Sequence, residues 1–261
     1  MLRAIRTAAT GMSAQQAGVD NIANNLANAN TVGYKQSKIV FHDLLYQTIQ
    51  AGSEGEAQGV QPATMQMGHG ATAIATVRNF TQGSLIETGN ALDVAINGDG
   101  FLQVRRPDGT VAYTRDGTLT RNAEGMLVTQ SGLPLEPDIA IPENTVEIHI
   151  SQDGLVSVRL QNEPDMVEVG QLELARFVNP AGLNPIGGNL YEQTQASGEP
   201  TIGTPGQDGL GTLMQGYLEA ANVDVVQEMV NLITAQRTYE LNSKMVTTGE
   251  EMLQIANNMK R

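Results

Sequence analysis

The chain has 261 residues, enough to bury a sizeable core, and a formal net charge of −13 at pH 7. It contains no cysteine, which excludes a disulfide framework and thiolate metal sites. Residues 31–217 hold 9 Lys and Arg against 21 Asp and Glu, a net charge of −12, and this disfavours nucleic-acid binding, since contacts to phosphates need clustered cations. No apolar run approaches the ~20 residues that span a bilayer, and polar residues interrupt the N-terminal segment where a signal peptide would be apolar.

The first 30 residues are predicted to form a helix that needs a partner. Thr, Ser, Gly and Asn residues lower its intrinsic helix propensity, so the isolated helix should be marginal. A row of positions alternates in spacing between three and four, which is the pattern of a coiled-coil seam. The row consists of Leu2, Ile5, Ala9, Met12, Gln16, Val19, Ala23 and Leu26.

Four asparagines form a second stripe on the same helix, at spacings i, i+3, i+4 and i+7. These residues are Asn21, Asn24, Asn25 and Asn28. We predict that they form a second contact face. A solvated polar face with a cap remains an alternative, because asparagine is common near helix ends. Asn30, Thr31 and Gly33 are expected to end the helix.

A second helix is predicted to begin after Asp224, a candidate N-cap with Gln227 at capping-box spacing, and to run almost to Arg261. Its first seam consists of Val225, Met229, Leu232, Gln236, Tyr239, Ser243, Val246 and Leu253. A second apolar row consists of Val226, Val230, Ile233, Met245, Met252, Ala256 and Met259. Either one row covers the N-terminal helix while the other meets neighbouring copies, or the whole helix is buried in one monomer.

The segment between the helices is predicted to be all-β, with short strands separated by Asp-Gly and Asn-Gly turns. The strongest local signal is the run Asn97-Gly98-Asp99-Gly100 between apolar residues 92–96 and 101–104, which predicts a β-hairpin. Residues 50–70 and 198–211 are poor in regular pattern and are interpreted as connectors or extended arms.

These patterns predict an α+β fold in which long terminal helices pair as a coiled-coil-like module around a mainly antiparallel, all-β middle domain. The expected division is a helical assembly domain from residues 1–30 and 222–261, an extended connector or β arm at 31–75, a β-rich outer domain at 76–197 and a return linker at 198–221.

No motif for catalysis or cofactor binding is recognisable, so no catalytic residue, metal ligand or cofactor is expected. His42, His69 and His149 are scattered and lack partners at metal-ligand spacing. The run around Gly98 and Gly100 is followed by a strand pattern, unlike a dinucleotide-binding turn, which precedes a helix. A secreted hydrolase or sugar-binding β domain with helical ends remains the alternative from another functional class.

Several motifs resemble those of the flagellar rod and hook proteins. They cover both ends and the middle of the chain, and their order and the chain length are most similar to distal rod subunits. The motifs are Ala23-Asn24-Asn25-Leu26-Ala27-Asn28, Thr31-x-Gly33-Tyr34-Lys35, residues 41–48, Asp93-Val94-Ala95-Ile96, Gly98-x-Gly100-Phe101, Tyr113-Thr114-Arg115-Asp116-Gly117, Gly216-Tyr217-Leu218-Glu219, Asn222-Val223 and residues 236–244.

The resemblance implies a non-enzymatic axial subunit that polymerises helically into the distal rod of the basal body and carries torque from motor to hook. Hook or proximal rod subunits are the nearest alternatives. The implied partners are further copies of the chain, proximal rod and hook or hook-rod junction subunits, and the surrounding periplasmic and outer-membrane rings. The implied location is the rod across the periplasm, where the subunits form part of the export channel.

The resemblance also implies export through the flagellar type III apparatus without cleavage of a signal peptide. Phe41 and Leu45 match its aromatic-x-x-x-apolar recognition element, although two core anchors would give the same spacing. Residues 50–67 resemble the insertion of distal rod subunits, for which a stiffening role is a hypothesis. Subunit assembly is assigned to residues of both helices: Leu2, Ile5, Met12, Val19, Ile22, Leu26, Asn21, Asn24, Asn25, Asn28, Val225, Met229, Leu232, Ile233, Tyr239, Val246, Met252 and Leu253.

Overall fold

The computed structural model describes residues 2–50, 65–161 and 165–259, which form two compact units. The helical unit comprises residues 1–27, 37–77 and 224–261, and the β unit comprises residues 28–36 and 78–223. The predicted α+β class is confirmed, with a helix at each end and a mostly antiparallel β middle. The predicted insertion at 50–67 lies largely outside the described residues, which resume at position 65.

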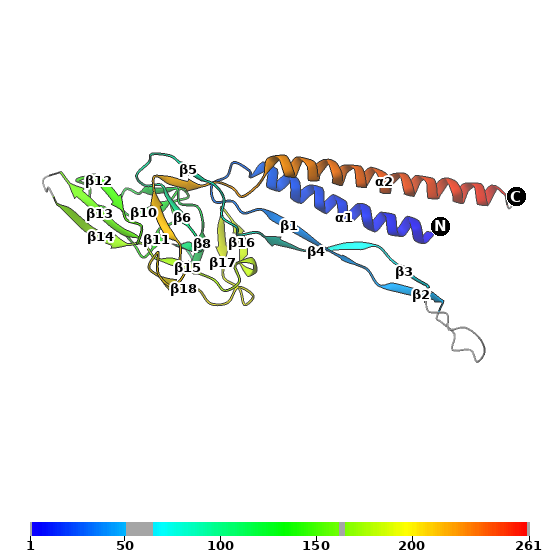
Figure 1. Cartoon of the computed structure of the whole chain (residues 1–261), viewed down its shortest axis with the longest axis horizontal. Coiled ribbons are helices and arrows are strands. Elements are labelled where there is room, and N and C mark those ends of the chain that lie inside the picture. Colours follow the sequence, from blue (N-terminus) through cyan, green and yellow to red (C-terminus); the bar gives the residue numbers. More distant parts are fainter. Residues whose placement is uncertain (1, 51–64, 162–164, 260–261) are drawn as a thin grey trace. The chain divides into compact units, whose positions relative to one another are not determined.

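Two long helices dominate the helical unit, α1 (Leu2–Ala27) and α2 (Val225–Asn258), and they lie side by side (Figure 1). The predicted N-cap of α2 is confirmed, because the Asp224 carboxylate accepts hydrogen bonds from the backbone N–H groups of Val226 at 2.9 Å and Gln227 at 3.1 Å. The side chain of Gln227, predicted to complete a capping box, donates its amide to Asn231 at 3.1 Å.

A narrow β arm completes the helical unit. It contains β1 (Ser37–Asp43), β2 (Tyr46–Gln50), β3 (Met65–Gly68) and β4 (Ala71–Arg78). β1 pairs with β4, and β2 pairs antiparallel with β3 with Tyr46 opposite Gly68. The strands of this arm form only two-stranded pairs, and most of their side chains are exposed. Such a ribbon is only marginally stable by itself in water.

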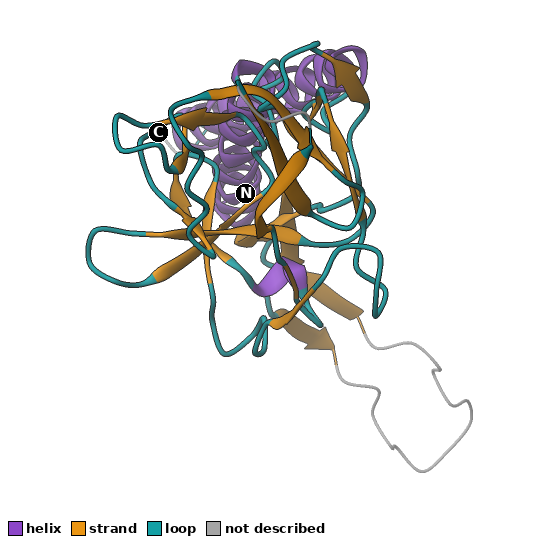
Figure 2. Cartoon of the chain, turned by 90° about the vertical axis from the view of Figure 1, so that its left-hand side faces the viewer, coloured by secondary structure: helices purple, strands orange, loops and turns teal. Residues whose placement is uncertain are grey.

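Short strands form most of the β unit, and the 3-10 turn η1 (Pro180–Gly182) is the only helical element in the described part of that unit (Figure 2). Its strands are β5 (Leu85–Glu87), β6 (Val94–Asn97), β7 (Phe101–Arg105), β8 (Val111–Thr114), β9 (Leu119–Arg121), β10 (Leu127–Thr129), β11 (Leu135–Glu136), β12 (Thr145–Ile150), β13 (Leu155–Leu160), β14 (Met166–Gln171), β15 (Leu174–Arg176), β16 (Asn184–Gly187), β17 (Leu190–Glu192), β18 (Thr201–Gly203), β19 (Thr212–Gln215) and β20 (Tyr217–Glu219).

The largest sheet has the order β16-β17-β8-β7-β15-β18, and β11 also pairs with β7. β12, β13 and β14 form a separate three-stranded antiparallel sheet. Two-stranded pairs join β9 to β10, β6 to β19, and β5 to β20. The last two pairs connect segments more than a hundred residues apart, so they close the β unit around strands from its beginning and its end.

The predicted hairpin around Asn97-Gly98-Asp99-Gly100 is wrong. β6 pairs with β19, with Ile96 opposite Leu213, while β7 pairs with β8, β11 and β15. Bonds to distant segments hold the loop between them, since the Gly98 N–H donates to Gln82 Oε1 and the Asp99 carbonyl accepts from the Gly211 N–H at 2.7 Å. A favourable local turn therefore did not decide which strands pair.

Residues 198–221, expected to form a return linker, contain three paired strands. β18 extends the largest sheet beside β15, β19 pairs with β6, and β20 pairs with β5. Each of these strands has only three or four residues. Such short segments carry too little periodicity to be recognised as strands, and their long-range partners hold them in place.

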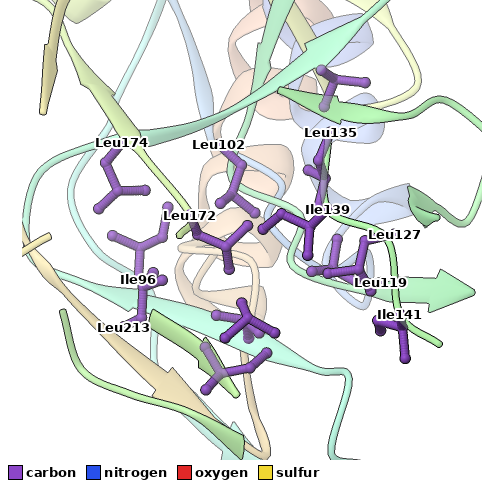
Figure 3. Packing of buried hydrophobic residues seen from close by; sticks show 14 of the residues in the cluster. Ile96, Leu102, Leu119, Leu127, Leu135, Ile139, Ile141, Leu172, Leu174 and Leu213 are labelled. Atoms are coloured by element: carbon purple, nitrogen blue, oxygen red, sulfur yellow. The ribbon is translucent and has the colours of Figure 1, made fainter. Parts of the chain in front are cut away.

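The core of the β unit is a cluster of aliphatic side chains from most of its strands (Figure 3). Alternation places Val156 and Val158 of β13 inward, both fully buried. A second, aromatic cluster contains Phe101, Tyr113 and Phe177, and the rings of Tyr113 and Phe177 meet edge to face with centroids 4.7 Å apart. Both clusters give the β unit a packed interior of its own.

Candidate functional site

The two helices of the helical unit run antiparallel and approach closely through small residues. A Cβ atom added at Gly249 would lie 2.9 Å from Cγ1 of Ile5, and one added at Gly11 would lie 3.1 Å from Nδ2 of Asn242. Residues 5 and 11 of α1 therefore face residues 249 and 242 of α2. Ala235 is also buried on α2.

These small residues were missed in the sequence because large apolar side chains defined the predicted seam. The buried and partly buried positions 228, 232, 235, 242, 246, 249 and 253 still follow steps of four, three and seven. A search for this spacing that also accepted Ala, Gly and Asn would have found them. Val225 and Met229, predicted on the same seam, are exposed.

Most other apolar residues that were assigned to subunit assembly are partly buried within the single chain. They are Ile5, Met12, Val19, Ile22, Leu26, Leu232, Val246 and Leu253. Tyr239 is exposed and borders a shallow hollow with Gln16 and Val19 of α1. For Leu2, the structure describes the backbone only.

The second apolar row of α2 is exposed along the whole helix. Val226 is 71% exposed, Ile233 58%, Met245 58% and Met259 80%. Val230, Leu241, Met252 and Ile255 are likewise exposed. The possibility that the helix is entirely buried within one monomer is therefore wrong, and the second apolar row remains uncovered.

The asparagine stripe divides between two environments. Asn25 is buried and pairs with the backbone of Ser37 at both ends of its amide: Nδ2 donates to the carbonyl at 2.8 Å and Oδ1 accepts from the N–H at 3.0 Å. Asn21 donates to the same carbonyl at 2.7 Å. Asn24 is exposed and Asn28 partly buried. Two of the four side chains thus hold the start of β1 against α1.

The two residues of the predicted export element lie in the β arm. Phe41 is in β1, 43% exposed, with its ring edge 3.8 Å from where a Cβ of Gly18 would lie. Leu45 is 87% exposed in the turn between β1 and β2. Neither residue is a core anchor within the single chain.

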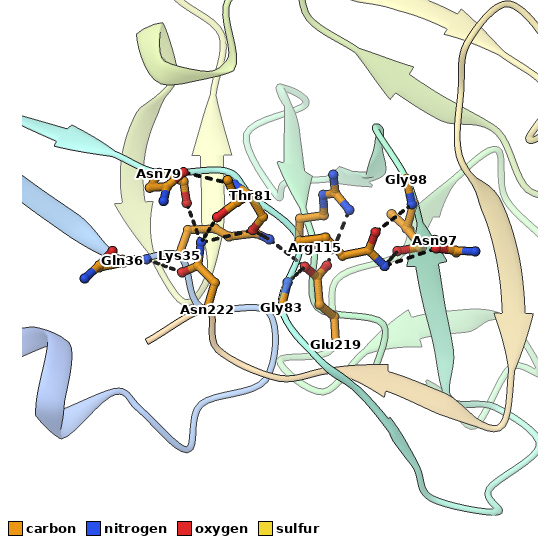
Figure 4. A network of polar contacts seen from close by, with 12 residues as sticks. Lys35, Gln36, Asn79, Thr81, Gly83, Asn97, Gly98, Arg115, Glu219 and Asn222 are labelled. Atoms are coloured by element: carbon orange, nitrogen blue, oxygen red, sulfur yellow. Dashed lines mark hydrogen bonds and ion pairs between the residues drawn. The ribbon is translucent and has the colours of Figure 1, made fainter. Parts of the chain in front are cut away.

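The motifs of the β unit converge on the buried carboxylate of Glu219 (Figure 4). Lys35 Nζ lies 2.5 Å from Oε1, and Arg115 Nη1 lies 3.4 Å from Oε2. The backbone N–H of Gly83 also donates to Oε1 at 2.8 Å. Lys35 and Glu219 have no exposed side-chain surface, and Arg115 has 2%. We call these three side chains the ion cluster.

Asn222 continues this network through its side-chain amide (Figure 4). Its Oδ1 accepts from the N–H of Gln36 at 2.7 Å, and its Nδ2 donates to the carbonyls of Asn79 at 2.7 Å and Thr81 at 3.0 Å. Lys35 Nζ donates to the same Thr81 carbonyl at 2.8 Å. Three separate chain segments are thus joined to one another by polar groups.

The glycine of the Thr31-x-Gly33-Tyr34-Lys35 motif is required by its surroundings. Gly33 has φ +68°, and a Cβ atom there would lie 2.8 Å from the backbone nitrogen of Asp116. Its N–H donates to the carbonyl of Glu219 at 2.8 Å. The motif therefore meets two others, the Arg115-Asp116 segment and the segment that ends in Glu219.

Burial sets the electrostatics of the ion cluster. It lowers the pKa of the Lys35 ammonium from its usual value, against the opposing attraction of Glu219. Burial also lowers the pKa of the Arg115 guanidinium, whose Nε has no hydrogen-bond partner and which lies 5.3 Å from the Phe101 ring centroid. Two cations share the Glu219 carboxylate, and Asp99 adds a further attraction that acts on Arg115.

Four cavities formed by described residues, with volumes of about 230–520 Å³, give no support to the hydrolase alternative. Each is lined by at most one carboxylate, whereas glycoside hydrolysis uses two. Among residues 2–50, 65–161 and 165–259, no group of His, Asp and Glu side chains is placed to hold a metal ion. Neither described helix is long and apolar enough to cross a membrane.

Known proteins match this chain along its full length. A protein of Borreliella burgdorferi named flagellar basal-body rod protein FlgG is 48% identical over 264 residues, covering 100% of both chains. The chain belongs to the flagellar basal-body rod protein family. The resemblance predicted from the motifs is confirmed, and the family is one of structural rod proteins of the flagellum.

Three family models also match this rod protein. They are described as flagella basal body rod protein at residues 5–35, flagellar hook protein FlgE/F/G D1 domain at residues 95–158, and flagellar basal body rod FlgEFG protein C-terminal at residues 214–259. The first and last cover most of α1 and α2.

Two rod proteins of Caulobacter vibrioides allow branches of the family to be compared. The one named FlgG is 46% identical over 99% of this chain and 100% of its own length. The one named FlgF is 37% identical over 90% of this chain and 88% of its own. This rod protein is therefore more similar to the FlgG branch.

Proposed function

We propose that this chain is an axial subunit that polymerises helically into the distal rod of the flagellar basal body. In this role it transmits torque from the motor to the hook and forms part of the export channel. Membership of the rod family and the greater similarity to proteins named FlgG support the assignment over a hook or proximal rod subunit. The rod's neighbours would be proximal rod and hook or junction subunits and the surrounding rings.

The exposed apolar row of α2 is the observation that carries this proposal. One face of the helix packs along α1 within the chain, in a pairing that we propose to be coiled-coil-like. The other face presents Val226, Val230, Ile233, Met245 and Met252 to solvent. Burying such a side chain contributes on the order of 1 kcal/mol, so covering the whole row with neighbouring copies would drive assembly.

The β arm supports the same proposal. Val40, Phe41, Ile74 and Val77 are exposed on its two-stranded ribbon, which by itself has little to stabilise it. Asn24 and the exposed seam residues Val225, Met229 and Tyr239 lie at the surface of the same unit. We propose that these residues also contact neighbouring copies.

Export through the flagellar type III apparatus, without cleavage of a signal peptide, is part of the proposal. Leu45 and Phe41 are accessible, as a recognition element must be. An export substrate passes through the channel unfolded, and a helical unit with few buried apolar side chains would unfold readily.

Charges placed in the apolar row should abolish assembly. The double variant Ile233→Glu/Met245→Glu is expected to form no tubes at concentrations where the wild type does, because each carboxylate would have to be buried between copies. Monomer stability should change by less than about 0.5 kcal/mol per site, since both positions are exposed. Electron microscopy of concentrated protein and a motility assay measure the effect.

The matched control is Thr247→Glu/Gln254→Glu, which adds the same charge at exposed positions of α2 outside both rows. This variant should assemble as the wild type does. Tubes and motility at wild-type levels in the Ile233→Glu/Met245→Glu variant would show that the row is not an assembly surface.

A further inference from the structure

The ion cluster lies where the chain passes between its two units. The chain crosses from one unit to the other after residues 27, 36, 77 and 223. Lys35 precedes the crossing after residue 36, and the 78–83 segment follows the crossing after residue 77. Glu219 and Asn222 precede the last crossing. The bonds of the ion cluster and of Asn222 join these segments to one another inside the β unit.

Stability alone does not explain a buried cluster of this composition. Removing three charges from water is costly, and apolar residues of similar volume are often as stable or more stable in such places. Two cations share one carboxylate, and the Arg115 Nε remains without a partner. A cluster of this kind is better suited to selecting one arrangement of the chain.

The geometry accepts only one register of the three segments. Lys35 Nζ reaches Glu219 Oε1 and the Thr81 carbonyl together, and Oε1 also accepts the Gly83 N–H. A shift of one residue in the segment of Lys35 or in that of Glu219 would leave a buried charge without its counter-ion, and a shift in the 78–83 segment would displace the carbonyl and the N–H that they bond. Asn222 constrains the same segments, because its side-chain amide accepts from the N–H of Gln36 and donates to the carbonyl of Asn79.

We infer that Glu219 is a positioning residue for assembly, which with Lys35 and Arg115 sets the register at which the chain leaves the β unit toward its terminal helices. This inference rests on the proposed function, since the helices carry the assembly surface. Removal of the ion cluster should therefore impair assembly even if the β unit remains stably folded.

The test replaces all three charged residues of the ion cluster by neutral ones in the full chain. We call this variant, Lys35→Met/Arg115→Met/Glu219→Gln, the neutral variant. The amide introduced by Glu219→Gln keeps an oxygen for the Gly83 N–H. The control is Arg159→Gln/Glu147→Gln, which removes an ion pair whose side chains are nearly half exposed. Hydrogen exchange is measured by NMR at two backbone amides, that of Gln36, which donates to Asn222 Oδ1, and that of Asn79, which donates to the Gln36 carbonyl.

The neutral variant should keep the thermal midpoint of the β unit within a few degrees of the wild type. Exchange at Gln36 and Asn79 should nevertheless become on the order of ten-fold faster, while core amides of β7 stay protected. Motility, measured in cells that carry the variant in place of the chromosomal copy, should fall well below that of the control.

Unchanged exchange at Gln36 and Asn79 would overturn the inference, and so would faster exchange with wild-type motility. If the neutral variant does not fold, Lys35→Met alone replaces it, because the Glu219–Arg115 pair remains, and the same readouts decide. If cells swim normally after the gene for this chain is deleted, the proposed function is refuted instead. Failure of the inference and failure of the proposed function are therefore distinguishable.

Discussion

At the scale of single residues, Glu219 links motifs that lie far apart in the sequence. Its carboxylate meets Lys35, 184 positions away, and Arg115, 104 positions away. All three belong to the motifs through which the chain resembles rod and hook proteins. Their place in the structure indicates that these motifs maintain the fold where the chain enters and leaves the β unit.

The charge balance of the ion cluster predicts unequal effects of single substitutions. Glu219→Gln leaves Lys35 without its counter-ion and Arg115 with only the weaker attraction of Asp99, and should cost about 3–5 kcal/mol of unfolding free energy. Lys35→Met leaves the Arg115–Glu219 pair and should cost less, about 1–3 kcal/mol, for the lost bonds to Glu219 and Thr81. Urea unfolding followed by near-UV circular dichroism measures both, and equal losses would contradict this account.

At the scale of elements, the terminal segments differ in what they bury. α2 packs one face on α1 through Ala235, Asn242 and Gly249 and leaves its opposite face exposed. β1 is held at its start by Asn21 and Asn25, whereas its later residues are exposed. Elements with one covered and one open face are typical of subunits that assemble.

The exposed residues at the end of β1 and in the loop after it lead to a prediction about export. Phe41→Ser and Leu45→Ser should each reduce secretion several-fold, because both remove an accessible apolar group. Leu45→Ser should barely change stability, since the side chain is almost fully exposed. Immunoblots of culture supernatant from cells unable to build rods measure secretion apart from assembly. Ile74→Ser, exposed on the paired strand β4, is the control, and secretion of both Phe41 and Leu45 variants at its level would refute the role.

At the scale of the whole molecule, the two units differ in their apolar interiors. The β unit has an aliphatic core and an aromatic cluster. In the described part of the helical unit, the buried apolar side chains are only Ala8, Ala14 and Ala235. Because apolar burial is the main favourable term in folding, the helical unit should be the less stable one in a monomer.

Unfolding of the dilute monomer should therefore occur in two steps. Helical circular dichroism should decrease before the near-UV signal of the tyrosines in the β unit. Amides of residues 2–27 should exchange faster than those of β7. Hydrogen exchange followed by mass spectrometry checks this, and protection across residues 2–27 equal to that of β7 would contradict it.

The sequence by itself determined the terminal helices, the Asp224 N-cap, the second apolar row of α2 and the family. These features depend on spacings of two to four residues or on contiguous motifs, which are visible in the chain. Only the tertiary structure decided that β6 pairs with β19 instead of β7, that Ala235 and Gly249 bring the helices together, and that Lys35, Arg115 and Glu219 meet. Such contacts join residues far apart in the sequence, and local patterns leave the choice among possible partners open until the whole core packs.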